Sequence, residues 1–91
     1  MRKYVIEREM PGIGGLPAES YCAGAQRSKN ALDELGTRIQ WLESYVTDNK
    51  VFCVYLADDE DVIRDHAQRS GFPATRIHPV RTIMDPTTAP A

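Results

Sequence analysis

Two neighbouring segments of this chain, residues 39–46 and 50–57, carry aromatic, acidic and sulfur-containing side chains at positions where strands usually carry plain polar residues. Both segments have the composition of β-strands, and Asp48 and Asn49 between them suit a hairpin turn. Side chains alternate between the two faces of a strand. One face of the predicted hairpin therefore carries Trp41, Glu43 and Tyr45 on its first strand and Val51, Cys53 and Tyr55 on its second. The opposite face, which is predicted to pack on the core, carries Leu42, Ser44, Val46, Phe52, Val54 and Leu56.

The first of these faces offers ligands for a metal ion. Cys53 and Glu43 lie on it, and Glu7 of an earlier predicted strand joins them in one of two registers. A thiolate, carboxylates and an imidazole form a suitable ligand set for nickel, zinc or copper. The competing interpretation is an interface between two subunits, because aromatic side chains are enriched at interfaces. The two interpretations are compatible, since a pocket can form between subunits.

His66 is a further candidate ligand. It lies on the predicted apolar stripe of the second helix, together with Val62 and Ile63. It is either a core histidine whose ring nitrogens have hydrogen-bond partners, or a metal ligand or proton carrier. His78, in the last predicted strand, lies in no metal-binding motif and is expected to be structural or solvent-facing.

The elements that must position these residues are predicted from their periodicity. Strands are expected over residues 3–9, 39–46, 50–57 and 76–84, and helices over 18–35 and from about 58 to 70. The glycine-containing loop of residues 10–16 is expected to be a flexible connection. The order βαββαβ predicts an α+β, ferredoxin-like fold, with a four-stranded antiparallel sheet and two helices on one face. Residues 1–91 are expected to form a single domain, in which residues 85–91 are an extended C-terminal tail.

Composition excludes several classes of protein. The net charge of −2 comes from interspersed acids and bases, which argues against a nucleic-acid partner. No apolar run approaches the roughly 20 residues of a membrane span, and the first residues lack the apolar core of a secretory leader. Cys22 and Cys53 form no C-x-x-C pair, so we expect free thiols in a cytoplasmic protein. A chain of 91 residues buries only a modest core, and a homodimer is expected.

Several segments resemble a bacterial domain-of-unknown-function family that includes a small nickel-binding, nickel-responsive protein. They are Y-V-I-E-R-E, I-Q-W-L-E-S-Y-V-T-D, K-V-F-C-V-Y, H-A-Q-R-S-G-F-P-A and I-M-D-P-T-T-A, which together span nearly the whole chain. The resemblance implies a ferredoxin-like homodimer that acts as a nickel sink. Residues 51–53 match a V-F-C strand of the nickel binder, and His66, Gly71 and Pro73 match its second helix and the turn after it. The chain differs from that protein at Phe72, and at Glu7 or Arg8, where the nickel binder has histidines.

These observations lead to three functional hypotheses. The first is a non-catalytic protein that sequesters a divalent transition metal, expected to be nickel, with His66, Cys53 and an acidic residue, Glu43 or Glu7, as ligands. Metal affinity then falls as His66 is protonated, and no organic cofactor is expected. The second hypothesis is a small enzyme or small-molecule-binding dimer whose pocket is lined by Glu43, Tyr45, Tyr55 and His66. The third is a plain dimeric interaction module.

Overall fold

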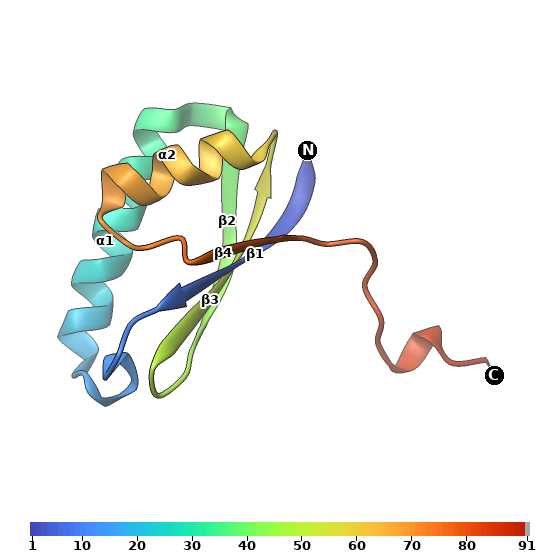
Figure 1. Ribbon diagram of the computed structural model, residues 1–91, viewed down its shortest axis with the longest axis horizontal. Coiled ribbons are helices and arrows are strands. Elements are labelled where there is room, and N and C mark those ends of the chain that lie inside the picture. The colour runs from blue at the N-terminus through green and yellow to red at the C-terminus, as the bar shows by residue number, and fades with distance from the viewer. Residues whose placement is uncertain (91) are drawn as a thin grey trace.

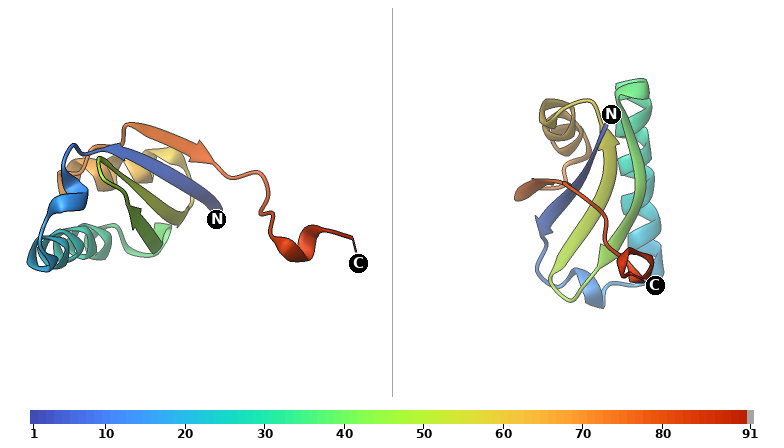
Figure 2. Two further views of the ribbon diagram at one scale, coloured as in Figure 1. Left: turned by 90° about the horizontal axis from the view of Figure 1, so that it is seen from below. Right: turned by 90° about the vertical axis from the view of Figure 1, so that its right-hand side faces the viewer.

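The computed structural model describes residues 1–90 and shows four strands and two helices in the order β1, α1, β2, β3, α2, β4 (Figure 1). The strands form one antiparallel sheet in the order β2-β3-β1-β4. Both helices lie on the same side of this sheet (Figure 2). The predicted ferredoxin-like α+β fold is therefore confirmed. The bounds are β1 Arg2–Glu9, α1 Ala18–Leu35, β2 Ile39–Val46, β3 Lys50–Ala57, α2 Glu60–Ser70 and β4 Arg76–Pro79, with short 3-10 turns η1 Ile13–Gly15, η2 Gly36–Arg38 and η3 Pro86–Thr88.

The ends of α2 follow from local chemistry. Asp59 is its N-cap, and its carboxylate accepts a hydrogen bond of 2.9 Å from the backbone N–H of Val62. Such a cap satisfies one of the free amides of the first helical turn. Gly71 ends the helix with a φ of 80°, a left-handed conformation that glycine adopts without a steric cost.

No helix among residues 1–90 is long and apolar enough to cross a membrane.

The predicted faces of the hairpin need correction. In β3 the helix side of the sheet is formed by Val51, Cys53 and Tyr55, all buried, and not by the residues between them. In β2 the pairing with β3 shifts between Trp41 and Glu43, which is a β-bulge. The bulge leaves Trp41 on the helix side and turns Glu43 and Tyr45 to the open side. The helix side therefore has three rows of residues that are paired across β2, β3 and β1. In that strand order, the rows are Trp41, Tyr55 and Tyr4; Ser44, Cys53 and Ile6; and Val46, Val51 and Arg8.

The open side of the sheet carries apolar side chains. Val5, Phe52, Val54 and Leu56 are partly buried there, and Tyr45 is exposed. Trp41 and Tyr55 do not contribute to this surface, so the three aromatic anchors predicted for a dimer are not together. The homodimer stays a prediction, now based on this apolar open face.

The last strand is shorter than predicted, because β4 ends at Pro79 and pairs only with β1. After Pro79 one more backbone hydrogen bond joins the chain to β1, from the N–H of Val80 to the carbonyl of Lys3 at 2.9 Å. Beyond it the chain leaves the body of the domain, as Figures 1 and 2 show, and residues 81–90 are exposed. Its only regular element among these residues is η3, where the Asp85 carboxylate accepts from the backbone N–H of Thr87 at 2.8 Å.

The glycine-containing loop after β1 is ordered by hydrogen bonds to the β2–β3 turn, and is not a free connection. The backbone N–H of Met10 donates to the carbonyl of Asn49 at 2.9 Å, and that of Gly14 donates to Asp48 at 3.0 Å. A Cβ at Gly14 would lie 2.6 Å from the carbonyl oxygen of Thr47. Only glycine allows this close approach of two backbones.

Gly14→Ala is expected to lower the free energy of unfolding by about 1–3 kcal/mol, because a methyl group there overlaps the backbone of the turn. Gly15→Ala is the matched control. A Cβ at Gly15 meets nothing within 4 Å, so its effect should stay within about 0.5 kcal/mol. Urea unfolding of both variants measures the difference, and equal stabilities would contradict the close approach.

Candidate functional site

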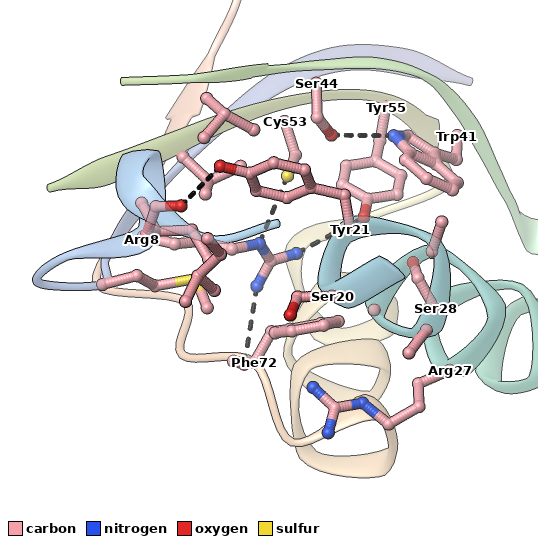
Figure 3. Close-up of a pocket in the computed structure, with 18 residues that line it drawn as sticks. Arg8, Ser20, Tyr21, Arg27, Ser28, Trp41, Ser44, Cys53, Tyr55 and Phe72 are labelled. Atoms are coloured by element: carbon pink, nitrogen blue, oxygen red, sulfur yellow. Dashed lines mark hydrogen bonds between the residues drawn. The ribbon is translucent and has the colours of Figure 1, made fainter. Parts of the chain in front are cut away.

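A cavity of about 520 Å³ lies between the helix side of the sheet and the N-terminal half of α1 (Figure 3). The sheet contributes Arg8, Cys53 and Tyr55 as its floor, with Trp41 at one side. Phe72, from the loop after α2, forms part of the opposite wall. The cavity is open to solvent, because Leu16, Ala23 and Val46 in its wall are exposed. It lies where a sheet and a helix usually pack directly against each other.

The sequence of α1 explains why the space is open. Ser20, Gly24 and Ser28 recur every four residues, which places them in one row along the helix. All three line the cavity, and their side chains are too small to fill it. Further along the same helix Ala31 and Leu35 are buried against the core. The C-terminal half of α1 thus packs on the sheet, whereas its N-terminal half bounds a hollow.

The most unusual residue of the cavity is Arg8, which is only 2% exposed. Its Nη1 donates to the carbonyl oxygens of Pro73 at 2.9 Å and Phe72 at 3.5 Å. Its Nε donates to Cys53 Sγ at 3.3 Å, and its Nη2 donates to Tyr55 Oη at 3.4 Å. No ion pair joins Arg8 to a carboxylate among residues 1–90. A buried guanidinium, almost always charged in proteins, thus has only neutral or thiol partners.

Tyr55 and His66 form a polar layer behind the cavity. His66 is fully buried, and its Nε2 lies 3.1 Å from the Ser28 hydroxyl. Its ring centroid is 5.4 Å from that of Tyr55. Burial raises the pKa of Tyr55, and the neighbouring Cys53 raises it further. Burial, and then the positive charge of Arg8, lower the pKa of His66 from 6.5 to about 4.

The Nδ1 atom of His66 is buried without a hydrogen-bond partner. An unsatisfied polar atom of this kind costs about 1–3 kcal/mol. The histidine predicted on the apolar stripe of the second helix is therefore a buried, neutral ring with one partnered nitrogen. Both cysteines are free thiols; Cys53 is buried and Cys22 is exposed.

The four residues predicted as metal ligands do not meet in this chain. His66 and Cys53 lie on the helix side of the sheet, where Cys53 accepts from Arg8. Glu43 lies on the open side, where its carboxylate accepts a 2.5 Å hydrogen bond from Tyr45 Oη and raises the pKa of that phenol. Glu7 lies on the open side of β1. Within residues 1–90 no three His, Cys, Asp or Glu side chains are grouped so that they could hold a metal ion.

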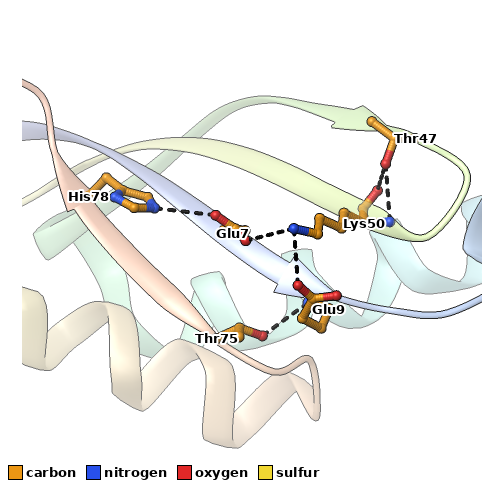
Figure 4. Close-up of polar contacts among 6 residues, drawn as sticks. All are labelled: Glu7, Glu9, Thr47, Lys50, Thr75 and His78. Carbon is orange, nitrogen blue, oxygen red and sulfur yellow. Dashed lines mark hydrogen bonds and ion pairs between the residues drawn. The ribbon is translucent and has the colours of Figure 1, made fainter.

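Glu7 is at the centre of a separate polar cluster on the open side (Figure 4). Its carboxylate accepts from Lys50 Nζ at 3.1 Å, and Lys50 also pairs with Glu9 at 3.1 Å. The hydrogen bond from Lys50 holds the pKa of Glu7 below its ordinary value. His78 Nε2 lies 3.4 Å from the other oxygen of Glu7. An exposed imidazole and a carboxylate are thus adjacent, but a lysine already neutralises the carboxylate.

Arg8 and Phe72 were noted in the sequence only as differences from the nickel binder, and Ser28 was not noted, so none of these three cavity residues was predicted as a site residue. An arginine is seldom buried, so composition does not select Arg8. The alternation along β1 is the available signal, because Tyr4, Ile6 and Arg8 share one face. Phe72 is brought to the cavity by the turn after α2, and the guanidinium carbon of Arg27 lies 4.7 Å from its ring centroid.

The architecture defines a small ferredoxin-like α+β protein with a cavity beneath its first helix. The family described as nickel responsive protein SCO4226-like matches residues 4–80, and the chain belongs to this family. The crystal structure of SCO4226 from Streptomyces coelicolor A3(2) is similar, with a TM-score of 0.70 and 17% sequence identity. The match covers 90% of this chain and 99% of that chain, and at this identity it shows the fold alone. Comparison with curated proteins found no match.

His66 is expected to make the protein less stable as the pH falls. The folded state keeps the ring neutral down to about pH 4, whereas the unfolded chain protonates it near pH 6.5. The contribution of His66 is therefore complete above about pH 6.5 and is lost as the pH decreases towards 4, by roughly 3 kcal/mol in total. Urea unfolding at about pH 7.5 and about pH 5 measures the loss.

Two variants separate His66 from the other titrating groups. His66→Gln should show a smaller pH dependence than the wild type between these two conditions. His78→Gln removes an exposed imidazole and should keep the wild-type dependence. The same pH dependence in the wild type and in His66→Gln would show that the buried ring is not the titrating group.

Proposed function

We propose that this protein binds a small, mainly apolar organic molecule in the cavity between the sheet and α1. The observation that supports this function is the cavity itself, whose 520 Å³ lies in the range of about 300–1,000 Å³ that is usual for ligand pockets. Its walls are largely apolar, and a few polar groups converge on its floor, as in most small-molecule sites. The small-molecule alternative of the sequence analysis is thus retained, with different lining residues. Tyr55 lies in the cavity and His66 directly behind it, whereas Glu43 and Tyr45 are on the other side of the sheet.

The protonation states favour binding over acid–base catalysis. A general acid or base works best when its pKa lies near the operating pH. The pKa of His66 is lowered to about 4, and that of Tyr55 is raised by burial. At neutral pH both groups are therefore uncharged and far from their titration. Tyr55, which lines the cavity, is suited to orienting a ligand by a hydrogen bond, and we propose a non-catalytic binding protein.

Filling the cavity is expected to abolish ligand binding. N-phenylnaphthylamine, a neutral dye that fluoresces in apolar surroundings, serves as the probe, and Trp41 in the cavity wall reports its approach. The wild type should bind the dye saturably. Gly24→Leu should weaken binding at least about tenfold, because the longer side chain occupies the cavity. Even a Cβ added at Gly24 would lie 3.4 Å from the Phe72 ring.

Gln26→Leu is the matched control for this substitution. It places the same side chain on the exposed surface of α1, two residues away, and should leave the affinity unchanged. Circular dichroism checks that both variants keep the fold. A wild type that shows no saturable binding, or a Gly24→Leu variant that binds as well as the wild type, would contradict the proposed function.

Nickel binding is a second candidate function, because the family to which the chain belongs is described as nickel responsive. The cavity is unsuited to a cation, since the positive charge of Arg8 contacts the one thiol there. The predicted ligands His66, Cys53, Glu43 and Glu7 are also divided between the two sides of the sheet. A nickel site therefore requires a ligand group that residues 1–90 of a single chain do not form. On the open side, where Glu7 and His78 are adjacent, a second copy of the chain can supply further ligands.

Calorimetric titration of untagged protein with nickel tests this second function. If the open side binds the metal, the wild type should bind it more tightly than about 0.1 mM, or roughly −5.5 kcal/mol. His78→Gln should then weaken binding at least tenfold, whereas His66→Gln, which alters a buried ring, should not. The opposite result for the two histidines would favour the ligand set predicted from the sequence. Affinity weaker than this limit in the wild type would exclude nickel sequestration.

A further inference from the structure

Arg8 is the feature of the cavity that a merely apolar ligand leaves unexplained. Its side chain is 2% exposed, and no carboxylate among residues 1–90 forms an ion pair with it. Placing a cation in such surroundings is costly unless an opposite charge and good hydrogen bonds compensate. Two neighbouring groups do not balance this charge, since His66 is a neutral ring and Arg27, at the same wall, is also positive. The Cys53 thiol contacts Nε, but no carboxylate among residues 1–90 lines the cavity as a counter-ion.

The contacts of the guanidinium divide it into an end held by backbone carbonyls and an edge without a carbonyl or carboxylate partner. Nη1 is anchored, because it donates to the Pro73 carbonyl at 2.9 Å. The edge formed by Nε and Nη2 contacts Cys53 Sγ at 3.3 Å, an ordinary length for a sulfur acceptor, and Tyr55 Oη at 3.4 Å, which is long for an oxygen acceptor. Hydrogen bonds from N–H to oxygen are usually about 2.7–3.2 Å long. This edge is the fork that binds a carboxylate through two parallel hydrogen bonds.

We propose that the ligand of the cavity is an apolar monocarboxylate, whose carboxylate pairs with the Nε and Nη2 edge of Arg8 while its hydrocarbon or aromatic body fills the space beneath α1. This inference rests on the proposed function and specifies the class of ligand. A single negative charge is favoured because one buried positive charge balances it, whereas a phosphate dianion would retain an uncompensated charge in an apolar cavity. Phe72 and Trp41 offer flat surfaces for the ligand body.

The charge of the ligand is tested with two probes of the same shape. Naphthoate and naphthamide differ in the carboxylate alone, and each is titrated as a competitor of N-phenylnaphthylamine. The wild type should bind naphthoate at least about tenfold more tightly, since a hydrogen-bonded charge pair contributes more than a neutral pair. Arg8→Met keeps the apolar stem without the charge and should lose this preference.

A control at the mouth of the cavity identifies which arginine acts. Arg27→Gln removes an exposed positive charge beside Phe72 and should keep the preference within about threefold, because solvent screens that charge. Loss of the preference in Arg27→Gln, with its retention in Arg8→Met, would overturn the proposal and place the anion outside the cavity.

A measurement on the wild type covers the case in which Arg8→Met does not fold. The nitrogen and proton resonances of Arg8 Nε–H should shift on titration with naphthoate and stay in place with naphthamide. Equal affinities for the two probes, or an unmoved Arg8 signal, would overturn the carboxylate inference and leave the proposed cavity intact. No binding of the dye, of naphthoate or of naphthamide would overturn both.

Discussion

The structure depends on one buried cation and the two carbonyl groups that hold it. Arg8 extends from β1 across the helix side of the sheet and donates to the backbone of Phe72 and Pro73, in the loop that follows α2. This contact joins β1 to the loop after α2, next to Ala74, which packs against the core. It also sets the position of Phe72, which is a wall of the cavity. Cys53, Tyr55 and His66 are all arranged around the same charge, and the neutrality of His66 follows in part from it.

The two sides of the sheet serve different purposes because of a single extra residue. The bulge in β2 at Leu42 turns Glu43 and Tyr45 away from the helices while Trp41 stays with them. The Trp41 indole N–H donates to Ser44 Oγ at 2.9 Å, across the bulge, so that both residues face the cavity. The helix side is thus apolar with one cation, whereas the open side combines apolar residues with the ion pairs of Glu7, Lys50 and Glu9.

The fold was largely predictable from the sequence, and the site was not. The bounds of β2, β3 and α1 follow from periodicity and turn residues. The faces of β3 were assigned wrongly, because residues 51–57 are apolar on both sides of the strand. Their alternation therefore does not show which side faces the helices. The bulge depends on how β2 meets its neighbour in space, which a local pattern does not contain. Arg8 was overlooked for a related reason, since an arginine flanked by glutamates is usually a solvated residue.

The C-terminal half of α1 packs on the core, whereas its N-terminal half lines the cavity. Core packing and cavity shape, two requirements that usually compete, thus fall on different residues. Ala31 and Leu35 contribute to the core, whereas Ser20 and Gly24 give the cavity its shape; Ser28, in the same row, also contacts the buried His66. Substitutions at Ser20 and Gly24 can therefore remodel the volume and chemistry of the cavity without removing a core contact. A family built on this plan can diversify what its members recognise through a few positions in one helix, while inheriting the same sheet, the same caps and the same folding core.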